Sequence, residues 1–344
     1  MAHSIADVAK LAKVSISTVS RVINRSTLVN EKTRARVESA IRTLGYQPNA
    51  FARGLMLRRS EIVGLVLPDL HGDFYSEIIR GANQRAREVG YNLVVSSTRE
   101  ANEGHSLLTA IHTRTLLDGV AVMVSEVTDS IAEVLRTFQL PFVILDDSVD
   151  GVPHDSVLID HQHGATAMMR HLVQELGKRR VIFVGGPETN FDTIARFSAY
   201  RSVLKDAGLS ASRRDVYHLD YQFDTAHVLA TRHLDEWLGP DSAVFASNDE
   251  MAAGVIAAAA ARGIAVPEQL AVVGFDDTRV ARMVRPALTT VRVPMARLGA
   301  EAIDLLVRRI GDPRRPRVQI MLQPELVIRE SCGGRGVAGR VAAR

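Results

Sequence analysis

From residue 61 to about residue 330, short apolar runs alternate with amphipathic stretches of helical periodicity. The runs at 62–67, 120–124 and 181–184 are apolar without a break. Strands of this kind are buried on both faces, as in parallel sheets that helices cover on each side. One series of runs precedes residue 161 and a second follows it. The pattern therefore predicts an α/β fold with two doubly wound parallel-sheet subdomains.

The first sixty residues differ from this body in charge. They carry 11 basic and three acidic side chains, whereas the remainder carries 31 basic and 36 acidic ones. The formal net charge of +3 over 344 residues thus combines a segment of +8 with a body of −5. Such asymmetry is typical of a polyanion-binding head on an ordinary globular body.

The basic segment also has the apolar periodicity of three short helices, which argues against a disordered tail. Ser4, Ser15 and Asn30 each precede one helical stretch and can cap it, and Gly45 ends the third. A tight turn separates the first two stretches. This layout predicts a small all-α helix-turn-helix head, whose second helix enters the major groove of DNA.

The motifs of this head resemble those of the LacI/GalR family of bacterial repressors. They are IADVAKLA at 5–12, VSxxTVSRVIN at 14–24, LGYxPN at 44–49 and ARxL at 52–55. The resemblance implies a DNA-binding head at 1–48, a hinge at 49–60 and an effector-binding and dimerisation core at 61–330. In that core, 61–161 and 291–323 form one periplasmic-binding-protein-like subdomain, and 162–290 and 324–330 form the other. Residues 331–344 are predicted to be a flexible tail.

The resemblance assigns DNA-contacting roles. Ile16 and Ser17 occupy the two positions that select the operator sequence; Ile16 suits a thymine methyl, and Arg21 suits guanine O6 and N7. Leu55 matches a leucine that wedges into the minor groove. For Ser4 and Asn30, helix capping alone is an equal alternative to phosphate contact. The expected phosphate contacts are Ser4, Ser15, Thr18, Asn24 and Asn30.

Polar residues just after the predicted strands indicate a ligand site, because ligands of doubly wound folds bind at the carboxyl ends of strands. Arg196 matches the family's ligand-clamping arginine, and Phe74 and Phe223 match its aromatic walls. Carboxylates and an amide near aromatic rings suit a neutral sugar or sugar derivative. For any single carboxylate or amide, ordinary loop and cap chemistry is an equal alternative. The predicted effector-binding residues are Asp69, Phe74, Asp146, Asp192, Arg196, Phe223, Asn248 and Asp276.

Two positions bear on the ligand class. The family's purine-binding branch has an arginine and a threonine where this chain has Asn190 and Asp192. The difference speaks against a purine, and Asp192 adds a further acceptor for hydroxyl groups.

These features predict a homodimeric repressor of palindromic operators, switched by a small molecule. A sugar-binding transport protein is the alternative, but the start of the chain lacks the basic-then-apolar pattern of a signal peptide. A regulator activated by a non-sugar corepressor is another. No enzymatic nucleophile–base motif is evident, so we expect no catalytic activity. No apolar run reaches about 18 residues, and a cytoplasmic, nucleoid-associated location is expected.

Three other motifs carry no predicted function. His161 and His163 have metal-ligand spacing but no third ligand nearby, so no metal is predicted. The glycine pattern at 334–339 lacks the helix that a dinucleotide site needs, so no cofactor is predicted. The single cysteine, Cys332, excludes an internal disulfide.

Overall fold

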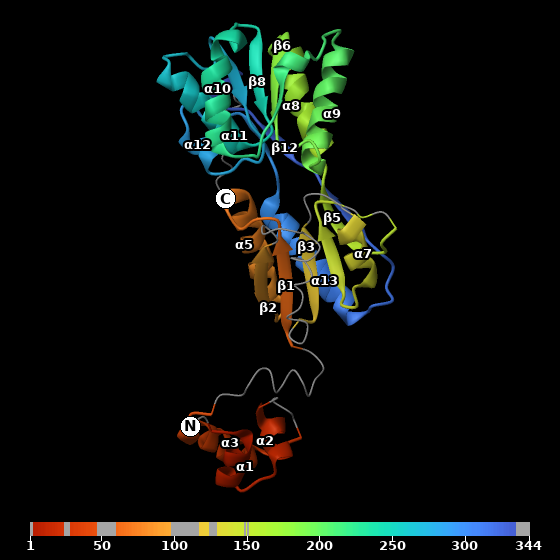
Figure 1. The fold of residues 1–344 in the computed structure, drawn as a ribbon. Helices are drawn as coiled ribbons and strands as arrows, with labels where there is room; N and C mark the ends of the chain where they lie inside the picture. The colour runs from red at the N-terminus through yellow and green to blue at the C-terminus, as the bar shows by residue number, and fades with distance from the viewer. Residues whose placement is uncertain are drawn as a thin grey trace. The chain divides into compact units, whose positions relative to one another are not determined.

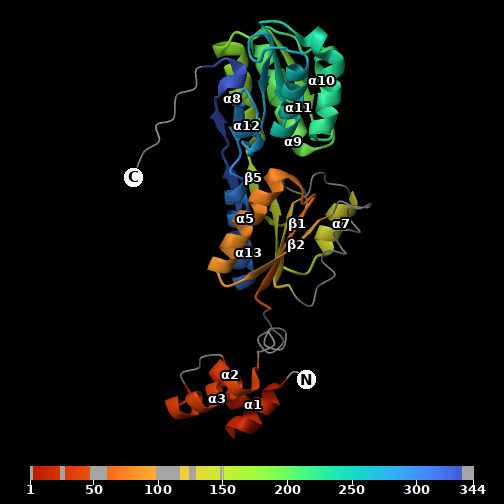
Figure 2. The ribbon, with the colours of Figure 1, turned by 90° about the vertical axis from the view of Figure 1, so that its left-hand side faces the viewer.

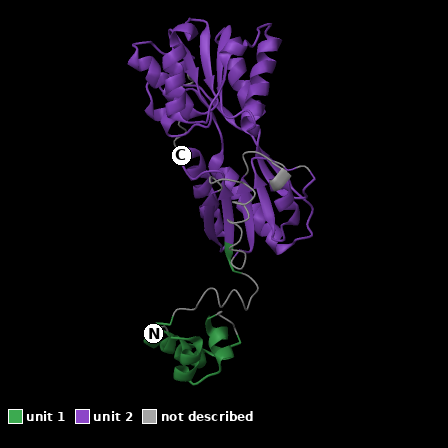
Figure 3. Ribbon diagram, viewed as in Figure 1, with its two compact units in different colours: residues 1–62 green, residues 63–344 purple. Residues whose placement is uncertain are grey.

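The structure is a computed structural model that describes residues 3–23, 28–46, 60–97, 117–123, 129–147, 149 and 151–334. Its internal contacts divide the chain into two compact units, Met1–Ile62 and Val63–Arg344 (Figure 3). We refer to the first unit as the head.

The head contains the three predicted helices. Ser4 caps the first through a reciprocal pair of bonds with Asp7: the serine hydroxyl accepts from the Asp7 amide, and the Asp7 carboxylate accepts from the Ser4 amide. Lys13, with φ at 51°, turns the chain into the second helix. Val8 and Val19 are fully buried in the small core between the helices. The helices are α1 (Ile5–Ala12), α2 (Ile16–Ile23) and α3 (Glu31–Leu44).

The larger unit contains two lobes. The first lobe is built on a six-stranded sheet with the order β11-β5-β4-β3-β1-β2, and its registers are parallel from β1 across to β11. The strands are β1 (Ile62–Leu67), β2 (Asn92–Ser97), β3 (Gly119–Met123), β4 (Phe142–Leu145), β5 (Asp155–Ile159) and β11 (Gln319–Leu322).

Helices cover both faces of this sheet (Figure 2). Leu65 and Leu67 pack into the same core as α5 and α13, whereas Val66, which points the other way, packs with α7. Two-sided burial explains why β1 is apolar at every position. The helices are α5 (Gly72–Glu88), α7 (Asp129–Thr137) and α13 (Met295–Gly311).

The second lobe repeats the arrangement on a parallel four-stranded sheet with the order β7-β6-β8-β9 (Figure 1). Its core divides in the same way: α8 and α9 pack on one face and α10 and α11 on the other. Two doubly wound parallel sheets are therefore confirmed. The strands are β6 (Arg180–Gly185), β7 (Val216–His218), β8 (Ser242–Ala246) and β9 (Ala271–Val273). The helical segments are α8 (His161–Arg170), η1 (His171–Glu175), α9 (Phe191–Asp206), η2 (Arg213–Asp215), α10 (Phe223–Trp237), α11 (Asp249–Ala261) and α12 (Val280–Met283).

Three segments join the lobes. The first leads from β5 directly into α8. The other two contain β10 (Thr290–Arg292) and β12 (Glu325–Val327), which pair antiparallel. The last of these segments is divided: β11 belongs to the first sheet, and β12 belongs to the pair with β10. Pro324 lies between them, and proline has no amide N–H to donate to a continuous ladder.

The predicted tail begins too early. Ser331 is fully buried, accepts from the Thr289 amide and donates to the Val272 carbonyl; with Cys332 it lies in a short helix, η3 (Glu330–Cys332). These bonds attach the segment to the second lobe, so residues 331–334 are part of the core. Residues 335–344 lie outside the described residues. Within the described part of the chain, no helix is long and apolar enough to cross a membrane.

Candidate functional site

The larger unit contains a cavity of about 360 Å³ between its two lobes. Its polar lining lies at the carboxyl ends of strands: Asp69 follows β1, Asp146 follows β4, and Asp276 follows β9. This is the position that the topology of doubly wound folds predicts. Seven of the eight predicted effector residues line the cavity, namely Asp69, Phe74, Asp146, Asp192, Arg196, Asn248 and Asp276.

The eighth, Phe223, is not among the lining residues. It is the first residue of α10, after Gln222 at the N-cap, and its ring stacks on His227 with 6.0 Å between ring centroids. The side chain is 38% exposed. Tyr221, two residues earlier in the loop before the helix, lines the cavity instead. Because α10 begins at Phe223, Tyr221 rather than Phe223 contributes an aromatic ring to the cavity wall.

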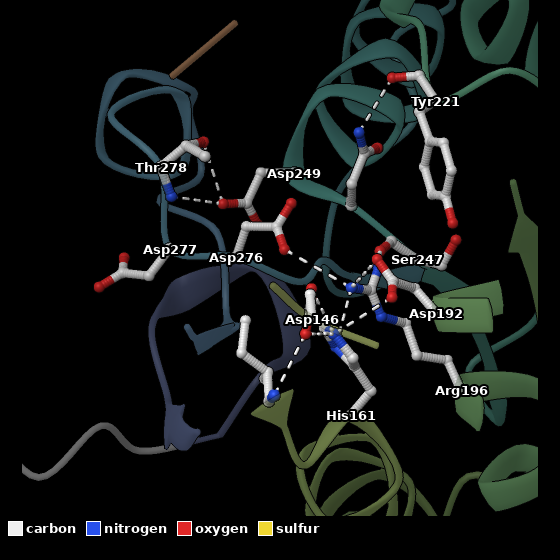
Figure 4. A network of polar contacts seen from close by, with 12 residues as sticks. Asp146, His161, Asp192, Arg196, Tyr221, Ser247, Asp249, Asp276, Asp277 and Thr278 are labelled. Carbon is white, nitrogen blue, oxygen red and sulfur yellow. Dashed lines mark hydrogen bonds and ion pairs between the residues drawn. The ribbon is translucent and has the colours of Figure 1, made fainter. Parts of the chain in front are cut away.

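Arg196 lies on α9 and is almost completely buried, with 2% of its surface exposed. It donates to the carbonyl of Ser247 and, through Nη2, to Nδ1 of His161 at 3.0 Å. Its Nη2 also lies 3.5 Å from Asp192, one helical turn earlier (Figure 4). Its Cζ lies 4.1 Å from the ring centroid of Phe275. These contacts hold the guanidinium in one position at the cavity.

His161, which the sequence analysis considers only beside His163, is a central member of the cluster. Arginine can only donate, so Nδ1 of His161 accepts from Arg196 and the ring proton is on Nε2. Nε2 lies 3.1 Å from both carboxylate oxygens of Asp146 and 3.2 Å from Asp192. Because Asp146 follows a strand of the first lobe and Arg196 lies on a helix of the second, this chain of contacts connects the lobes.

The structure places two carboxylates beside His161 that were not evident from sequence, and the resulting group does not include His163. Asp146, His161 and Asp192 each offer a ligand atom, and these atoms lie within 4.8 Å of one another. Carboxylate oxygens and an imidazole nitrogen suit a divalent cation. The guanidinium of Arg196, 3.0 Å from the imidazole, opposes a metal cation at this position.

Asp276 has a buried carboxylate without a full set of partners. Its Oδ1 has no hydrogen bond within the described part of the chain and lies 3.9 Å from Nη2 of Arg196. Burial raises the pKa of Asp276 to about 6, against the nearby charge of Arg196, which lowers it. Its φ is 108°, an unusual value for a residue with a Cβ. The backbone is held there by bonds with Val291 and Val293.

Unusual backbone conformations recur around the cavity. Asp146 has a φ of 61° and Tyr221 a φ of 67°, in addition to the 108° of Asp276. Non-glycine residues in this region are uncommon, and they concentrate where a site needs a particular side-chain direction. Three such residues around one cavity therefore support its identification as a ligand site.

Four aromatic side chains contribute to the lining: Phe74, Tyr75, Phe191 and Tyr221. Burial raises the pKa of both tyrosines, so each keeps its phenolic proton at neutral pH. Tyr75 and Tyr221 were not predicted from sequence. Tyr75 lies on α5 and Tyr221 lies between β7 and α10, so only the folded chain brings both to the cavity.

Two polar residues at the cavity also bind the surrounding chain. Asn248 caps α11 by accepting from the Met251 amide, and its side-chain amide donates to the carbonyl of Tyr221 at 2.9 Å. Asp249 is fully buried and accepts from Thr278 and Thr290. The cap chemistry that the sequence analysis left open for Asn248 is therefore present, in a residue that also lines the cavity.

The head presents its predicted base-reading residues on α2. Ile16, Ser17 and Arg21 are exposed, and Ile16 exposes 51% of its surface. Ser15 caps the helix through the Thr18 amide.

Among the predicted phosphate-contacting residues, Ser4, Ser15 and Asn30 each precede the first residue of a helix. Ser4 and Asn30 cap α1 and α3, and Asn30 accepts from the Thr33 amide at 2.9 Å. Their capping alternative is thus present in the structure. Asn24 and Leu55 lie outside the described residues.

Comparison with protein families matches both parts of the chain. The family described as bacterial regulatory proteins, lacI family, matches residues 4–49, and the periplasmic binding protein-like domain matches residues 169–332. Catabolite control protein A of Priestia megaterium is 35% identical over 308 residues, which cover 89% of this chain and 92% of that protein. The ribose operon repressor of Escherichia coli is 34% identical over 94% of this chain and 98% of its own length. The transcriptional repressor PurR of Vibrio atlanticus is 31% identical over 95% of this chain and 98% of its own length.

Solved structures match most of the chain. The lac repressor dimer bound to operator and the anti-inducer ONPF matches with a TM-score of 0.86 and 27% identity, covering 96% of this chain and 99% of that one. The complex of the transcriptional regulator CelR with cellobiose matches with a TM-score of 0.71 and 32% identity, covering 96% of this chain and 99% of that one.

Proposed function

The chain belongs to the LacI family of bacterial transcriptional regulators, and we propose that a sugar or sugar derivative, bound in the cavity between its lobes, sets its affinity for operator DNA. The family relationship establishes a DNA-binding repressor with an effector-binding core. The class of effector and the residues that bind it are the proposal.

The observation that carries the proposal is the chemistry of the cavity lining. Carboxylates, the Asn248 amide and the Arg196 guanidinium offer both acceptors and donors to hydroxyl groups, and the aromatic rings offer apolar faces for a sugar ring. One similar regulator, CelR, has been solved with cellobiose. Another relative is named PurR, so a non-sugar corepressor remains the alternative for the effector.

A ligand bound between the lobes can change the affinity for operator DNA by changing how the lobes are arranged. The lobes are joined by three crossing segments and by Arg279, which donates to the carboxylate of Asp73 on α5 through its backbone amide and its guanidinium. A ligand that fits one arrangement of the lobes better than another shifts the population toward that arrangement. In a homodimer on a palindromic operator, such a shift changes the spacing of the two heads.

For the head, we assign base reading to Ile16, Ser17 and Arg21. Ser4, Ser15, Thr18, Asn24 and Asn30 contact phosphates in this proposal, and Leu55 wedges into the minor groove. The relatives compared are transcriptional regulators, and we assign this chain no catalytic turnover of its effector.

The test begins with operator selection from random duplexes by the full-length protein, followed by a screen for sugars that alter operator affinity. Arg196→Ala is expected to abolish the response to an effector so identified, because it removes the buried donor at the cavity. Arg201→Ala is the matched control: it is an exposed arginine on the same helix. A full effector response in Arg196→Ala would contradict the pocket assignment.

A further inference from the structure

The cavity has an excess of negative charge beyond what hydroxyl recognition needs. Among the described residues, seven carboxylates line it against a single arginine. They are Asp69, Asp146, Asp192, Asp220, Asp249, Glu250 and Asp276. A neutral polyol needs acceptors, but backbone carbonyls and side-chain amides supply these without net charge.

The imbalance persists in the buried centre of the cavity. Among the described side chains Arg196 is the one permanent cation at this centre, and Asp146, Asp192 and Asp276 all lie around it and His161. Counted as ionised, the three aspartates and Arg196 carry a formal net charge of −2 with a neutral His161 and −1 with a protonated one. A closed cavity around a neutral ligand would leave this charge without water and without a counter-charge, which is costly.

Two features at this centre point toward a bound cation. The buried Oδ1 of Asp276 has no hydrogen-bond donor within the described part of the chain, although Asp276 lines the cavity and is only 6% exposed. The walls include the rings of Phe74, Tyr75, Phe191 and Tyr221. Aromatic faces attract organic cations through the ring quadrupole, and carboxylates complete the recognition.

We propose that the effector is a polyhydroxylated amine, such as an amino sugar, whose protonated nitrogen binds against the carboxylates of Asp192 and Asp276. This inference rests on the proposed function, since it names the chemical class of that effector. The ammonium supplies the missing donor to Asp276 and brings the buried charge toward zero, while the hydroxyl groups use the remaining acceptors.

A divalent metal at Asp146, His161 and Asp192 would also supply positive charge. The geometry favours the amine, for two reasons. The Arg196 guanidinium directly contacts the imidazole of His161, and the imidazole Nε2 already donates to carboxylates. A metal would need that nitrogen deprotonated, next to a fixed cation.

The experiment compares matched ligands on the full-length protein by thermal shift and calorimetry at pH 7. Glucose, galactose and mannose are each tested beside the 2-amino-2-deoxy sugar and its N-acetyl form, and glucitol is tested beside 1-amino-1-deoxyglucitol. The free amines are expected to raise the melting temperature, and to bind at least about tenfold more tightly than the uncharged partners, because a charge-assisted contact is the stronger one. Asp192→Asn is expected to remove this preference, whereas Asp206→Asn, an exposed carboxylate on the same helix, keeps it.

Three results would overturn the inference. The first is that a neutral or N-acetyl form binds more tightly than the free amine. The second is that no amine shifts the melting temperature. The third is that Mg²⁺ or Zn²⁺ stabilises the protein, that a chelator reverses this stabilisation, and that the ligand binds only when the metal is present. The operator assay separates this failure from failure of the proposed function. If a neutral sugar alters operator affinity, the proposed function stands and the cationic class is wrong; if no sugar of either kind alters it, both are wrong.

Discussion

Replacing Asp276 by asparagine is expected to stabilise the protein at neutral pH, although it removes a buried group that lies near an arginine. Burial raises the pKa of Asp276 from 3.8 in the unfolded chain to about 6 in the folded one. The charged groups that face it are Arg196 and His161, which lower the pKa, and Asp192 and Asp146, which raise it. The difference between the folded and unfolded pKa corresponds to about 3 kcal/mol against the ionised form in the folded state.

The sign of the pH dependence follows from this difference. The folded state binds the proton of Asp276 more tightly than the unfolded state does, so the wild-type free energy of unfolding falls as pH rises from about 4 to about 6 and changes no further above that from this group. The asparagine of the variant cannot ionise and retains the shape of the side chain. Asp276→Asn is therefore expected to be more stable than wild type by up to about 3 kcal/mol at pH 7.5 and equal to it near pH 4.

The assay is urea unfolding followed by fluorescence of Trp237, which is the only tryptophan, is fully buried and lies in the same lobe as Asp276. Asp277→Asn is the matched control. The carboxylate of Asp277 accepts from Arg329 at 2.5 Å and Arg292 at 2.8 Å, so its neutralisation should cost about 1–3 kcal/mol at pH 7.5. The expected outcome is that the substitution at Asp276 raises the free energy of unfolding at pH 7.5, whereas the one at Asp277 lowers it. If Asp276→Asn unfolds at a lower urea concentration than wild type at pH 7.5, the carboxylate is structural and the reasoning is refuted.

Three further predictions concern packing and DNA binding. Gly299→Ala should lower the free energy of unfolding by about 2–3 kcal/mol, because the new Cβ would lie 2.2 Å from the carbonyl oxygen of Ile78 on α5. The control is Gly311→Ala, at the end of the same helix and with open space around it, which should be neutral or stabilising in the same urea titration. Leu55→Ala should weaken operator binding in a mobility-shift assay while leaving dimerisation, measured by sedimentation, intact; unchanged operator affinity would contradict the wedge assignment. Arg21→Ala should relax base preference at one operator position and cost about 1–3 kcal/mol in fluorescence anisotropy, whereas an even loss across all operator variants would indicate a phosphate contact.

The fold is predictable from sequence where a single element carries its own signal. Strands buried on both faces are apolar at every position, and the helices of the head have caps and periodicity within a few residues. The strand β5, which was not predicted, lacks such a signal because it begins with Asp155. That aspartate is buried in the structure because Arg309 donates to both of its carboxylate oxygens, at 2.9 and 3.0 Å. Since Arg309 lies 154 residues later, no local pattern indicates that a charged residue starts a buried strand there.

The candidate site likewise contains residues that the sequence predicts and residues that it does not. Residues that directly follow strands were found because the topology of parallel sheets places their ends together. His161 was missed because its partners, Asp146 and Arg196, lie 15 and 35 residues away on different lobes. That one residue changes the interpretation of the site, because it shows that Arg196 is already engaged by the protein. The contacts of Arg196 with His161, Asp192 and Asp276 are therefore the basis of our proposal that the effector carries a positive charge, which residue types alone did not suggest.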